Sequence, residues 1–497
     1  SDAYSLVSQD FGKLKHVLGL TTPGLVFAES PLFARAIDAA VPPGCEVVLA
    51  SGSLEHRRIT PFDELLATAP SALVEAAHQR TGPDTIVKFL FTSGSTDLPK
   101  GVVNTHRMWC ASQQMLRQCM AFLAEAPPVI VDWLPWNHTF GGNHNVGIAL
   151  YNGGSLYIDD GSPTPGGVQE TIRNLRELSP TIYFNVPKGL EQIANAMDHD
   201  EVLRNSLFAR LQAFMFSGAG LSQAVWNKLD AHAVASTGER IRFITGIGMT
   251  ETGPSGTLAV GPHASSGDIG LPEPGITAKL VPVDGKTEIR FKGPTVFTGY
   301  WRSEAQTAKA FDEEGFYRTG DAVRWADEAD TDRGLRFDGR ISEDFKLSSG
   351  TFVSVGPLRA KVILAGHPLV QDVVVTGLNQ NEVGLLVFAR LDDCRRWAGV
   401  PDDTPAAQVL RHDTVRTFFQ ELADRLWASG SGSASRPARL HLLAEPPSID
   451  AGEATDKGSI NQKAVLERRH ALVEMLHSMG DGHHDVILPR ACQRAAA

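Results

Sequence analysis

Cysteine is scarce in this sequence. The 497 residues contain five cysteines and no C-x-x-C pair, and their positions are scattered: Cys45, Cys110, Cys119, Cys394 and Cys492. An odd and scattered set supports neither a disulfide framework nor a zinc site, so it favours a reducing compartment.

Long apolar runs and an excess of basic residues are also missing. Candidate spans such as residues 373–388 are interrupted by Asn and Glu, and no basic–apolar–small signal opens the chain. The net charge of −11 argues against nucleic-acid binding, which needs a basic face. We therefore expect a cytoplasmic protein without a membrane segment. Ser1 stands where a start methionine would, so we expect that the native start is trimmed or lies upstream.

What is present is an alternation of strand-like and helix-like segments. A chain of this length exceeds one simple core and predicts two or more domains. Residues 86–91 form a short β-rich run before a Ser/Gly/Thr loop, and residues 103–124 have the few breakers of a long helix. Further strands are predicted at 128–134, 155–158, 181–185, 213–217 and 242–245, with helices at 167–178 and 188–197. This order predicts an α/β fold with a largely parallel sheet.

The pattern changes beyond residue 261. Residues 276–297 alternate and are punctuated by Gly and Pro, which predicts a small antiparallel or β-barrel-like unit. A smaller unit follows, with strands predicted at 370–376 and 383–389, a helix at 415–428 and a Ser/Gly-rich linker or loop at 429–435. We therefore predict a large N-terminal domain of layered α/β sheets at 1–342, a small α+β C-terminal domain at 343–478, and a disordered tail at 479–497.

The strongest chemical signal is the loop from Thr92 to Gly101, directly after the first strand. Small hydroxyl residues and glycine let backbone N–H groups approach an anion, and Lys100 adds a positive charge. The loop is not a Walker A motif, because Pro99 precedes the lysine and Gly101 follows it. The plain alternative is a polar strand-to-helix loop. The residues assigned to phosphate binding are Thr92, Ser93, Gly94, Ser95, Thr96 and Lys100.

This loop resembles the phosphate-binding motif of the acyl-adenylate-forming superfamily, which contains acyl-CoA synthetases, luciferases and peptide-synthetase adenylation domains. Further motifs of that superfamily follow in order up to about residue 470. Residues 217–220 resemble its adenine-contacting turn, residues 247–251 its acidic motif, and residues 317–321 its ribose motif. Gly339, Arg340 and Lys346 resemble the start of its small mobile domain. The resemblance implies an ATP-dependent, AMP-forming ligase that uses Mg²⁺ and coenzyme A.

The resemblance also assigns roles to single residues. Thr250 is expected at the α-phosphate and Glu251 at the magnesium ion, while Asp321 and Arg340 are expected at the ribose. Two anions meet in such a reaction, so cations and N–H donors matter more than a proton-transfer pair. The alternatives are a solvated carboxylate for Glu251 and a surface ion pair for Arg340. The other residues assigned to the nucleotide are Gly218, Ala219, Gly220, Ile247, Gly248, Met249, Lys346 and Gly350.

The acid site is expected at residues 132–142, where two Trp, one His and one Phe surround a Gly-rich turn. The resemblance places His138 near the acyl carboxylate, and the alternative is a core aromatic cluster with a satisfied histidine. Relatives that bind amino acids use an Asp nearby, whereas Asn137 and His138 stand here. Residues 132–144, 183–188 and 455–461 resemble feruloyl-CoA synthetases, which implies an aromatic hydroxycinnamic acid as the substrate.

The sequence departs from the superfamily in three places. Only 91 residues precede Thr92, so the N-terminal segment is either reduced or partly absent. Ile247 stands where members of the superfamily usually have a tyrosine that stacks on adenine, so we expect weaker stacking on that side of the base. In the C-terminal lysine motif Ser459 occupies the lysine position, so we expect Lys457 to act as the adenylation lysine, with Lys463 in reserve.

The hinge residue, two alternative functions and the oligomeric state are left open by the sequence. Glu343, rather than Asp344, falls three residues after Arg340, and one of that pair is expected to be the hinge. Two other functions remain: an enzyme that loads a carrier-protein thiol, and a nucleotide-binding regulator without turnover. No carrier-like segment follows the lysine motif. The oligomeric state is open between a monomer and a homodimer.

Overall fold

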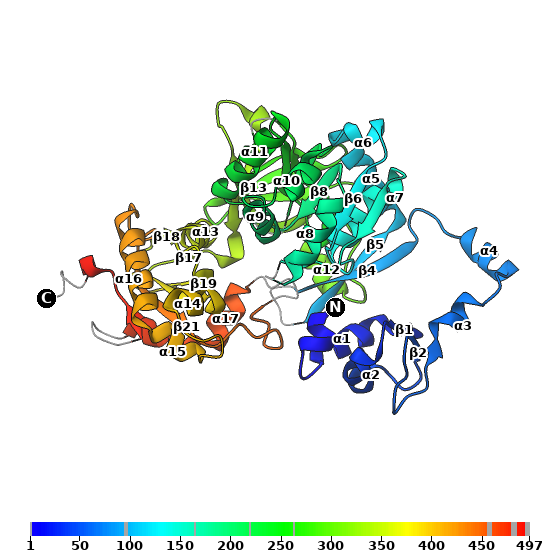
Figure 1. Ribbon diagram of the computed structural model, residues 1–497, viewed down its shortest axis with the longest axis horizontal. Coiled ribbons are helices and arrows are strands. Elements are labelled where there is room, and N and C mark those ends of the chain that lie inside the picture. The colour runs from blue at the N-terminus through cyan, green and yellow to red at the C-terminus, as the bar shows by residue number, and fades with distance from the viewer. Residues whose placement is uncertain are drawn as a thin grey trace. The chain divides into compact units, whose positions relative to one another are not determined.

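A computed structural model describes residues 2–93, 98–163, 166–217, 220–261, 264–454, 460–478 and 485–492 (Figure 1). The chain divides into two compact units. Unit 1 comprises Ser1–Thr68, Ser93–Pro99 and Asp338–Ala497, and unit 2 comprises Ala69–Thr92 and Lys100–Phe337. The boundary after residue 342 stays a prediction.

Unit 2 is built around a nine-stranded mixed sheet with the order β13-β14-β15-β16-β12-β11-β10-β9-β8. The β8–β9 and β9–β10 pairs are parallel, whereas β11, β12, β13 and β14 join antiparallel neighbours. Two shorter ladders, β4-β5 and β6-β7, complete the strands. The bounds are β4 Ile86–Ser93, β5 Pro99–Thr105, β6 Val129–Asp132, β7 Ser155–Ile158, β8 Ile182–Asn185, β9 Ala213–Phe216, β10 Arg242–Ile247, β11 Thr257–Ala259, β12 Asp268–Pro272, β13 Thr277–Val283, β14 Lys286–Lys292, β15 Tyr317–Trp325 and β16 Leu335–Arg340.

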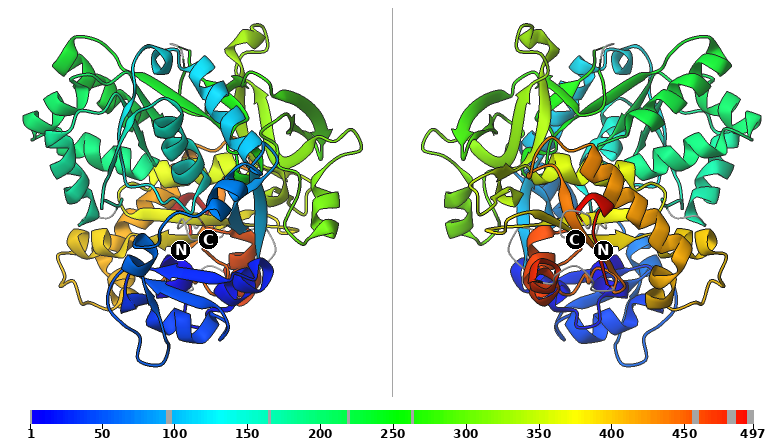
Figure 2. Two further views of the ribbon diagram at one scale, coloured as in Figure 1. Left: turned by 90° about the vertical axis from the view of Figure 1, so that its right-hand side faces the viewer. Right: turned by 90° about the vertical axis from the view of Figure 1, so that its left-hand side faces the viewer.

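Helices cover both faces of the parallel strands, which explains why these strands are apolar on both sides. On β8, Tyr183 packs with helices α8 to α11, while Ile182 and Phe184 pack with α5, α6 and α7 (Figures 1 and 2). The helix bounds are α4 Ala72–His78, α5 His106–Cys119, α6 Phe122–Glu125, α7 Val146–Tyr151, α8 Gly167–Glu177, α9 Pro187–Ala196, α10 Glu201–Phe208, α11 Gln223–Thr237 and α12 Glu304–Ala310, with short turns η3 Thr139–Asn145, η4 Thr250–Thr252 and η5 Thr331–Arg333. The predicted α/β fold is confirmed, but the expectation of a largely parallel sheet was wrong, because most strand pairs of the nine-stranded sheet are antiparallel.

One predicted helix begins later than expected. Residues 99–105 form strand β5, and α5 starts only at His106. Val102 forms an antiparallel bridge with Tyr300, so the backbone here is held extended. The Thr105 side chain then accepts the N–H of Met108 and caps the helix. The single helix predicted at 103–124 was therefore wrong in its first turn, and it also breaks after Cys119.

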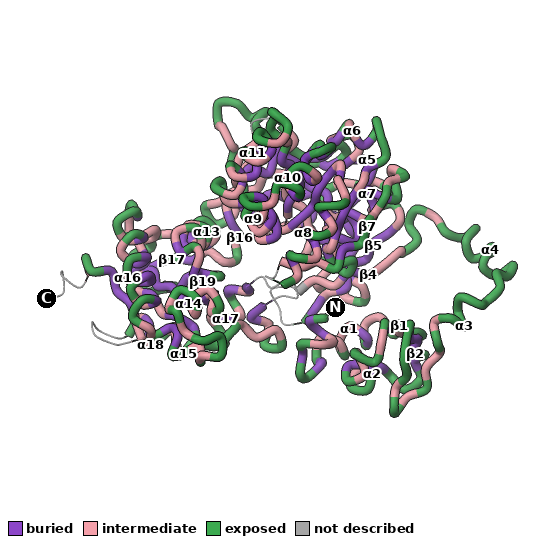
Figure 3. The backbone as a smooth tube through the Cα atoms, viewed as in Figure 1, coloured by how far each residue is buried: buried purple, intermediate pink, exposed green. Residues whose placement is uncertain are grey.

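Unit 1 contains a parallel three-stranded sheet, β1-β2-β3, and a four-stranded sheet, β19-β20-β21-β22. Helices α13 to α16 pack on one face of the larger sheet, and α17 and α18 pack on the other. Figure 3 shows the buried residues of these elements in purple. The bounds are η1 Ala3–Val7, α1 Gly12–Thr21, β1 Leu25–Ala28, η2 Pro31–Phe33, α2 Ala34–Ala40, β2 Glu46–Leu49, β3 Thr60–Pro61, α3 Phe62–Leu66, η6 Ile341–Glu343, β17 Phe345–Lys346, β18 Phe352–Val353, α13 Val355–Ala365, β19 Val370–Thr376, β20 Val383–Ala389, α14 Leu391–Ala398, α15 Ala406–Arg411, α16 Asp413–Ala428, β21 Pro437–Leu443, α17 Gln462–Arg468, α18 His470–Ser478 and β22 Val486–Ile487.

The predicted disordered tail contains one ordered strand. Within the described residues 485–492, Ile487 pairs with Leu440, so β22 adds an antiparallel edge to β21. The apolar pair Val486–Ile487 was too short to predict a strand by periodicity. No helix in the described part of the chain is both long enough and apolar enough to cross a bilayer.

Candidate active site

The assigned residues of unit 2 gather at one edge of its parallel strands. Strands β8, β9 and β10 run in the same direction, and the N–H of Thr181, just before β8, donates to Val129 O at the start of β6 (2.9 Å). Their carboxyl ends therefore share an edge, which is where open α/β sheets bind ligands. The segments that leave these ends carry His138, Gly220 and Glu251.

The phosphate loop is described only at its two ends. Thr92 lies half-buried near the end of β4, and Lys100 is the second residue of β5. Gly94, Ser95 and Thr96 lie outside the described residues, as do Gly218 and Ala219 of the adenine turn. Their roles stay predictions.

The acidic motif forms a tight turn directly after β10. Its glycine is required, because a Cβ on Gly248 would lie 1.5 Å from the carbonyl oxygen of Pro254. The N–H of Met249 donates to Thr252 Oγ1 (3.1 Å), which starts the short helix η4. This places Thr250 and Glu251 in the turn with exposed fractions of 6% and 8%. The solvated alternative for Glu251 is excluded by this burial.

A tyrosine that the sequence did not single out holds Glu251. The hydroxyl of Tyr300 donates to Glu251 Oε1 (2.9 Å), and Tyr317 donates in turn to Tyr300. Burial and the Glu251 carboxylate raise the pKa of Tyr300, so the phenol remains a donor. Lys100 Nζ lies 4.8 Å from the centre of the Tyr300 ring. Buried tyrosines commonly have partners, so the stretch Thr298-Gly-Tyr-Trp301 carried no separate signal.

The acid segment is held by its backbone carbonyls. Lys88 Nζ donates to Gly142 O (2.8 Å) and lies 4.0 Å from the centre of the Trp109 ring. Burial lowers the pKa of Lys88 to about 8. Trp109 Nε1 and Gln113 Nε2 both donate to Asn143 O (2.7 and 3.0 Å). These contacts hold the π-helix η3 in place, and His138 is the residue immediately before it.

The predicted aromatic cluster is only partly assembled. His138 and Phe140 are half-buried, whereas Trp136 is 51% exposed. A histidine that the sequence analysis did not assign, His144, is almost fully buried instead and packs between two rings. Its centroid lies 5.3 Å from both Phe140 and Phe184. Its place in Gly-Gly-Asn-His gave no signal of burial, because η3 is a π-helix that follows neither the strand nor the α-helix period.

The protonated nitrogen of His144 follows from a buried chain of hydrogen bonds. Asn145 Nδ2 donates to Asp132 Oδ2 (3.0 Å), so Asn145 Oδ1 faces His144 Nδ1 (2.9 Å). Nδ1 must therefore carry the proton, which leaves Nε2 as an acceptor. Nε2 is buried and has no partner among the described residues. Burial lowers the pKa of His144 to about 4 and raises the pKa of Asp132 to about 6.

The ribose residue Asp321 is buried in β15, with 4% of its surface exposed. Its N–H donates to Thr319 Oγ1 (3.0 Å), and the N–H of Gly320 donates to Glu288 Oε1 (3.0 Å). Arg290 ties Glu288 to Asp312, so this strand is held by a buried ion cluster. The backbone that carries Asp321 is therefore fixed.

The assigned residues of unit 1 are mostly at its surface. Arg340 and Lys346 are exposed, and Gly350 forms the turn between β17 and β18 at a φ of 80°. Of the hinge pair, Asp344 accepts the N–H of Val355 and caps α13 (2.8 Å), while burial raises the pKa of Glu343.

The lysine motif can be described only at its borders. Lys457 lies outside the described residues. An antiparallel bridge joins Ala454 and Ile460, the nearest described residues before and after it. Lys463 is a surface residue of α17, paired with Glu467 at 3.7 Å. Next to Ala454, fully buried Glu453 contacts Arg469 (2.6 Å) and Arg468 (2.7 Å).

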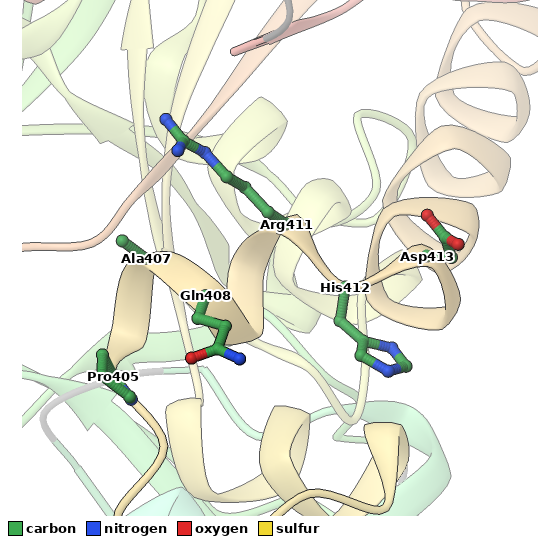
Figure 4. A pocket seen from close by; sticks show the side chains of 6 residues that line it. All are labelled: Pro405, Ala407, Gln408, Arg411, His412 and Asp413. Carbon is green, nitrogen blue, oxygen red and sulfur yellow. The ribbon is translucent and has the colours of Figure 1, made fainter.

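An open hollow of about 610 Å³ lies elsewhere on unit 1, beside α15. Figure 4 shows Arg411 and His412 pointing in different directions from it. No residue assigned from the sequence lines this hollow, so it does not form part of the candidate site. Among the described residues, no group of three or more His, Cys, Asp or Glu side chains could hold a metal ion by itself.

Comparisons with known proteins define first the class and then the family. The chain resembles the structure of ATP-bound MatB from Rhodopseudomonas palustris (TM-score 0.63, 20% identity, 93% of this chain and 82% of the other). It also resembles an anthranilate CoA ligase in complex with anthranoyl-AMP (TM-score 0.67, 18% identity, 94% and 81%). At these identities the likeness shows the fold that the chain shares with them. The model of the family "AMP-binding enzyme" matches residues 9–301, so the chain belongs to this family.

A curated relative covers most of the chain. Long-chain-fatty-acid–CoA ligase 1 of Cavia porcellus is 25% identical over 94% of this chain and 73% of its own length. The chain spans as little as 36% of other curated relatives it matches.

Proposed function

We propose that this chain is an AMP-forming ligase that converts a hydroxycinnamic acid, such as ferulate, to its coenzyme A thioester. In the first step the carboxylate attacks the α-phosphorus of ATP and pyrophosphate leaves. In the second step the thiol of coenzyme A attacks the acyl carbonyl, loses its proton, and AMP leaves. The family and the order of the motifs support this reaction class.

The residues of unit 2 fit the nucleotide and its magnesium ion. Glu251 offers a buried carboxylate whose Oε1 accepts the hydrogen of the Tyr300 hydroxyl, which leaves Oε2 for a cation. Such an oxygen suits Mg²⁺, which neutralises phosphate charge when bound. Lys100 and Thr250 would contact the phosphates, Asp321 the ribose, and His138 the acid carboxylate. Lys457 would stabilise the charge on the α-phosphate.

The observation that supports an aromatic substrate is that His144 Nε2 is buried and lacks a hydrogen-bond partner among the described residues. A buried acceptor without a partner costs free energy, on the order of 1–3 kcal/mol, unless a ligand or water supplies a donor. The flanking rings of Phe140 and Phe184 suit a flat aromatic ring. A phenolic hydroxyl on such a ring would donate to Nε2. Ferulate offers this donor, whereas a fatty acid does not.

The substrate is tested by comparing specificity constants for ferulate, cinnamate, palmitate and malonate, measured by AMP release. The last two represent the acids named for relatives of this chain. We expect ferulate to exceed palmitate and malonate by at least about 100-fold, because the hydroxyl contact is lost with both. Comparable constants for palmitate and ferulate would overturn the substrate assignment.

A variant isolates the hydroxyl contact. His144→Phe keeps a ring but removes the acceptor, so the preference for ferulate over cinnamate should fall about ten-fold. His56→Phe, at a side chain that is 76% exposed, is the matched control. An unchanged preference in His144→Phe would separate this histidine from the substrate.

Two assays separate the rival functions. Carboxylate-dependent exchange between ATP and pyrophosphate distinguishes a ligase from a regulator without turnover. Thioester formation with free coenzyme A distinguishes the proposed enzyme from one that loads a carrier-protein thiol.

A further inference from the structure

A short segment, residues 297–301, connects the two charged groups of the nucleotide site through its backbone. The N–H of Phe297 donates to Glu251 O (2.8 Å), and the N–H of Trp301 donates to Gly101 O (2.8 Å), beside Lys100. The turn with Glu251 and the strand with Lys100 are thus bonded to the same five residues.

The side chain of Tyr300 makes the same connection. Its hydroxyl donates to Glu251 Oε1, and Lys100 Nζ lies 4.8 Å from the centre of its ring. The ring is 8% exposed and packs against Phe297, with centroids 4.8 Å apart. Tyr317 donates to the Tyr300 oxygen and so orients the hydroxyl hydrogen toward the carboxylate.

The hydrogen bond settles which carboxylate oxygen is available. Because Oε1 accepts the phenol hydrogen, rotation of the Glu251 carboxylate is restrained, and Oε2 is the oxygen not engaged by that bond. Ligands that a second group orients bind metals more tightly than ligands that rotate freely.

We propose that Tyr300 is a positioning residue, which fixes the Glu251 carboxylate for a divalent cation and holds Lys100 beside it through its ring. This inference rests on the proposed role of Glu251.

The test is cation binding by the full chain without turnover. Binding of Mn²⁺ is measured by electron paramagnetic resonance in the presence of α,β-methylene-ATP, which is not cleaved at the α-phosphorus. Tyr300→Phe should weaken Mn²⁺ binding about 10–100-fold, because the carboxylate loses its outer partner. Tyr151→Phe is the matched control, since it removes a surface hydroxyl bonded to Gln114, and it should bind like wild type.

Glu251→Gln makes failure of the inference distinguishable from failure of the proposed function. If Glu251→Gln loses Mn²⁺ binding while Tyr300→Phe equals Tyr151→Phe, the positioning role is overturned and the ligand assignment stands. If Glu251→Gln binds Mn²⁺ like wild type, the ligand assignment falls and the positioning role falls with it.

The ring contact is tested without metal. Tyr300→Phe keeps the aromatic face, so its affinity for α,β-methylene-ATP in EDTA should equal that of wild type, which also shows that the variant is folded. Tyr300→Leu removes the face and should weaken metal-free binding about two- to five-fold. Equal affinities for the Phe and Leu variants would overturn the contribution of the ring to holding Lys100.

Discussion

Glu251 in unit 2 is 8% exposed and hydrogen-bonded to Tyr300, whereas the reserve lysine of unit 1, Lys463, has a side chain that is 65% exposed. Both units contain buried charges, but at different places. In unit 2 the assigned residue Glu251 is itself one of the buried carboxylates. In unit 1 the buried Glu453 borders the lysine motif and contacts two arginines. In unit 2 buried charge is thus found on the assigned residue, whereas in unit 1 buried charge holds the junction of α17 and α18 against Glu453.

The largest effect is expected from Glu453 in unit 1. Glu453→Gln should lower the free energy of unfolding of this region by about 3–5 kcal/mol, because two arginines lose a buried counter-charge. Hydrogen exchange over residues 462–478 measures the change. Glu467→Gln is the control, because Glu467 is an exposed residue of α17, the helix that carries Arg468. Its free energy of unfolding should differ from that of wild type by less than about 0.5 kcal/mol. Equal protection in both variants would remove the distinction drawn between Glu453 and a surface carboxylate.

The next effect concerns catalysis in unit 2. Glu251→Gln should slow ATP–pyrophosphate exchange by about 10²–10³, or about 2.7–4 kcal/mol, because the magnesium ion would lose its anionic protein ligand. Glu313→Gln, at a side chain that is 94% exposed, should exchange like wild type. Wild-type exchange in Glu251→Gln would mean that its burial is structural only.

The two lysines sharpen the comparison inside unit 1. Lys457→Ala should slow adenylation by about 10² while thioester formation from supplied acyl-adenylate stays nearly intact. Lys463→Ala should leave both half-reactions unchanged, since its ion pair with Glu467 is a surface contact. The opposite result would move the role to Lys463, and equal slowing of both half-reactions by Lys457→Ala would contradict a lysine that serves adenylation alone.

The smallest effect is a pH dependence that both units share. Burial lowers the pKa values of His144 in unit 2 and His477 in unit 1 to about 4. The unfolded chain, with a histidine pKa of about 6.5, binds more protons between pH 4 and 6.5, so stability is lost as the pH falls through this window. For fully buried His144 the loss is roughly 2 kcal/mol at pH 5. Denaturation at pH 5 and 7 measures it, and His144→Gln should reduce the dependence whereas His56→Gln should not.

The sequence predicted most of the elements because their apolar patterns are local. Strands β7, β19 and β20 match their predicted bounds, and the strands of the parallel sheet lie within one or two residues of theirs. The helix predicted from residue 103 failed because the bridge between Val102 and Tyr300 joins segments about 200 residues apart. Periodicity cannot report such a contact.

The acidic motif singled out Glu251, which the structure shows to be buried and bonded to Tyr300, while its role as a magnesium ligand stays a prediction. Tyr300 and His144 were missed because their importance lies in what they touch. A tyrosine after Gly299 and a histidine after Asn143 are ordinary residues until the fold places them beside Glu251 and Phe184. The domain boundary and Lys457 remain predictions.

The chain of hydrogen bonds from Asp132 through Asn145 decides which nitrogen of His144 carries the proton, so a change at Asp132 should alter the hydrogen bond that the proposed acid site can offer. Asp132 Oδ1 accepts the N–H of Leu134 (3.1 Å), so in Asp132→Asn the new amide group must face Asn145 instead. Asn145 would then turn over and offer its own N–H to His144 Nδ1, which moves the imidazole proton to Nε2.

Nε2 of His144 would thereby change from a hydrogen-bond acceptor to a donor. Acids with a para-methoxy or para-nitro group should gain on their para-hydroxy analogues in Asp132→Asn, as rates of AMP release would record. One buried carboxylate oxygen, replaced by nitrogen, would retune substrate choice without altering the shape of any residue that the substrate contacts.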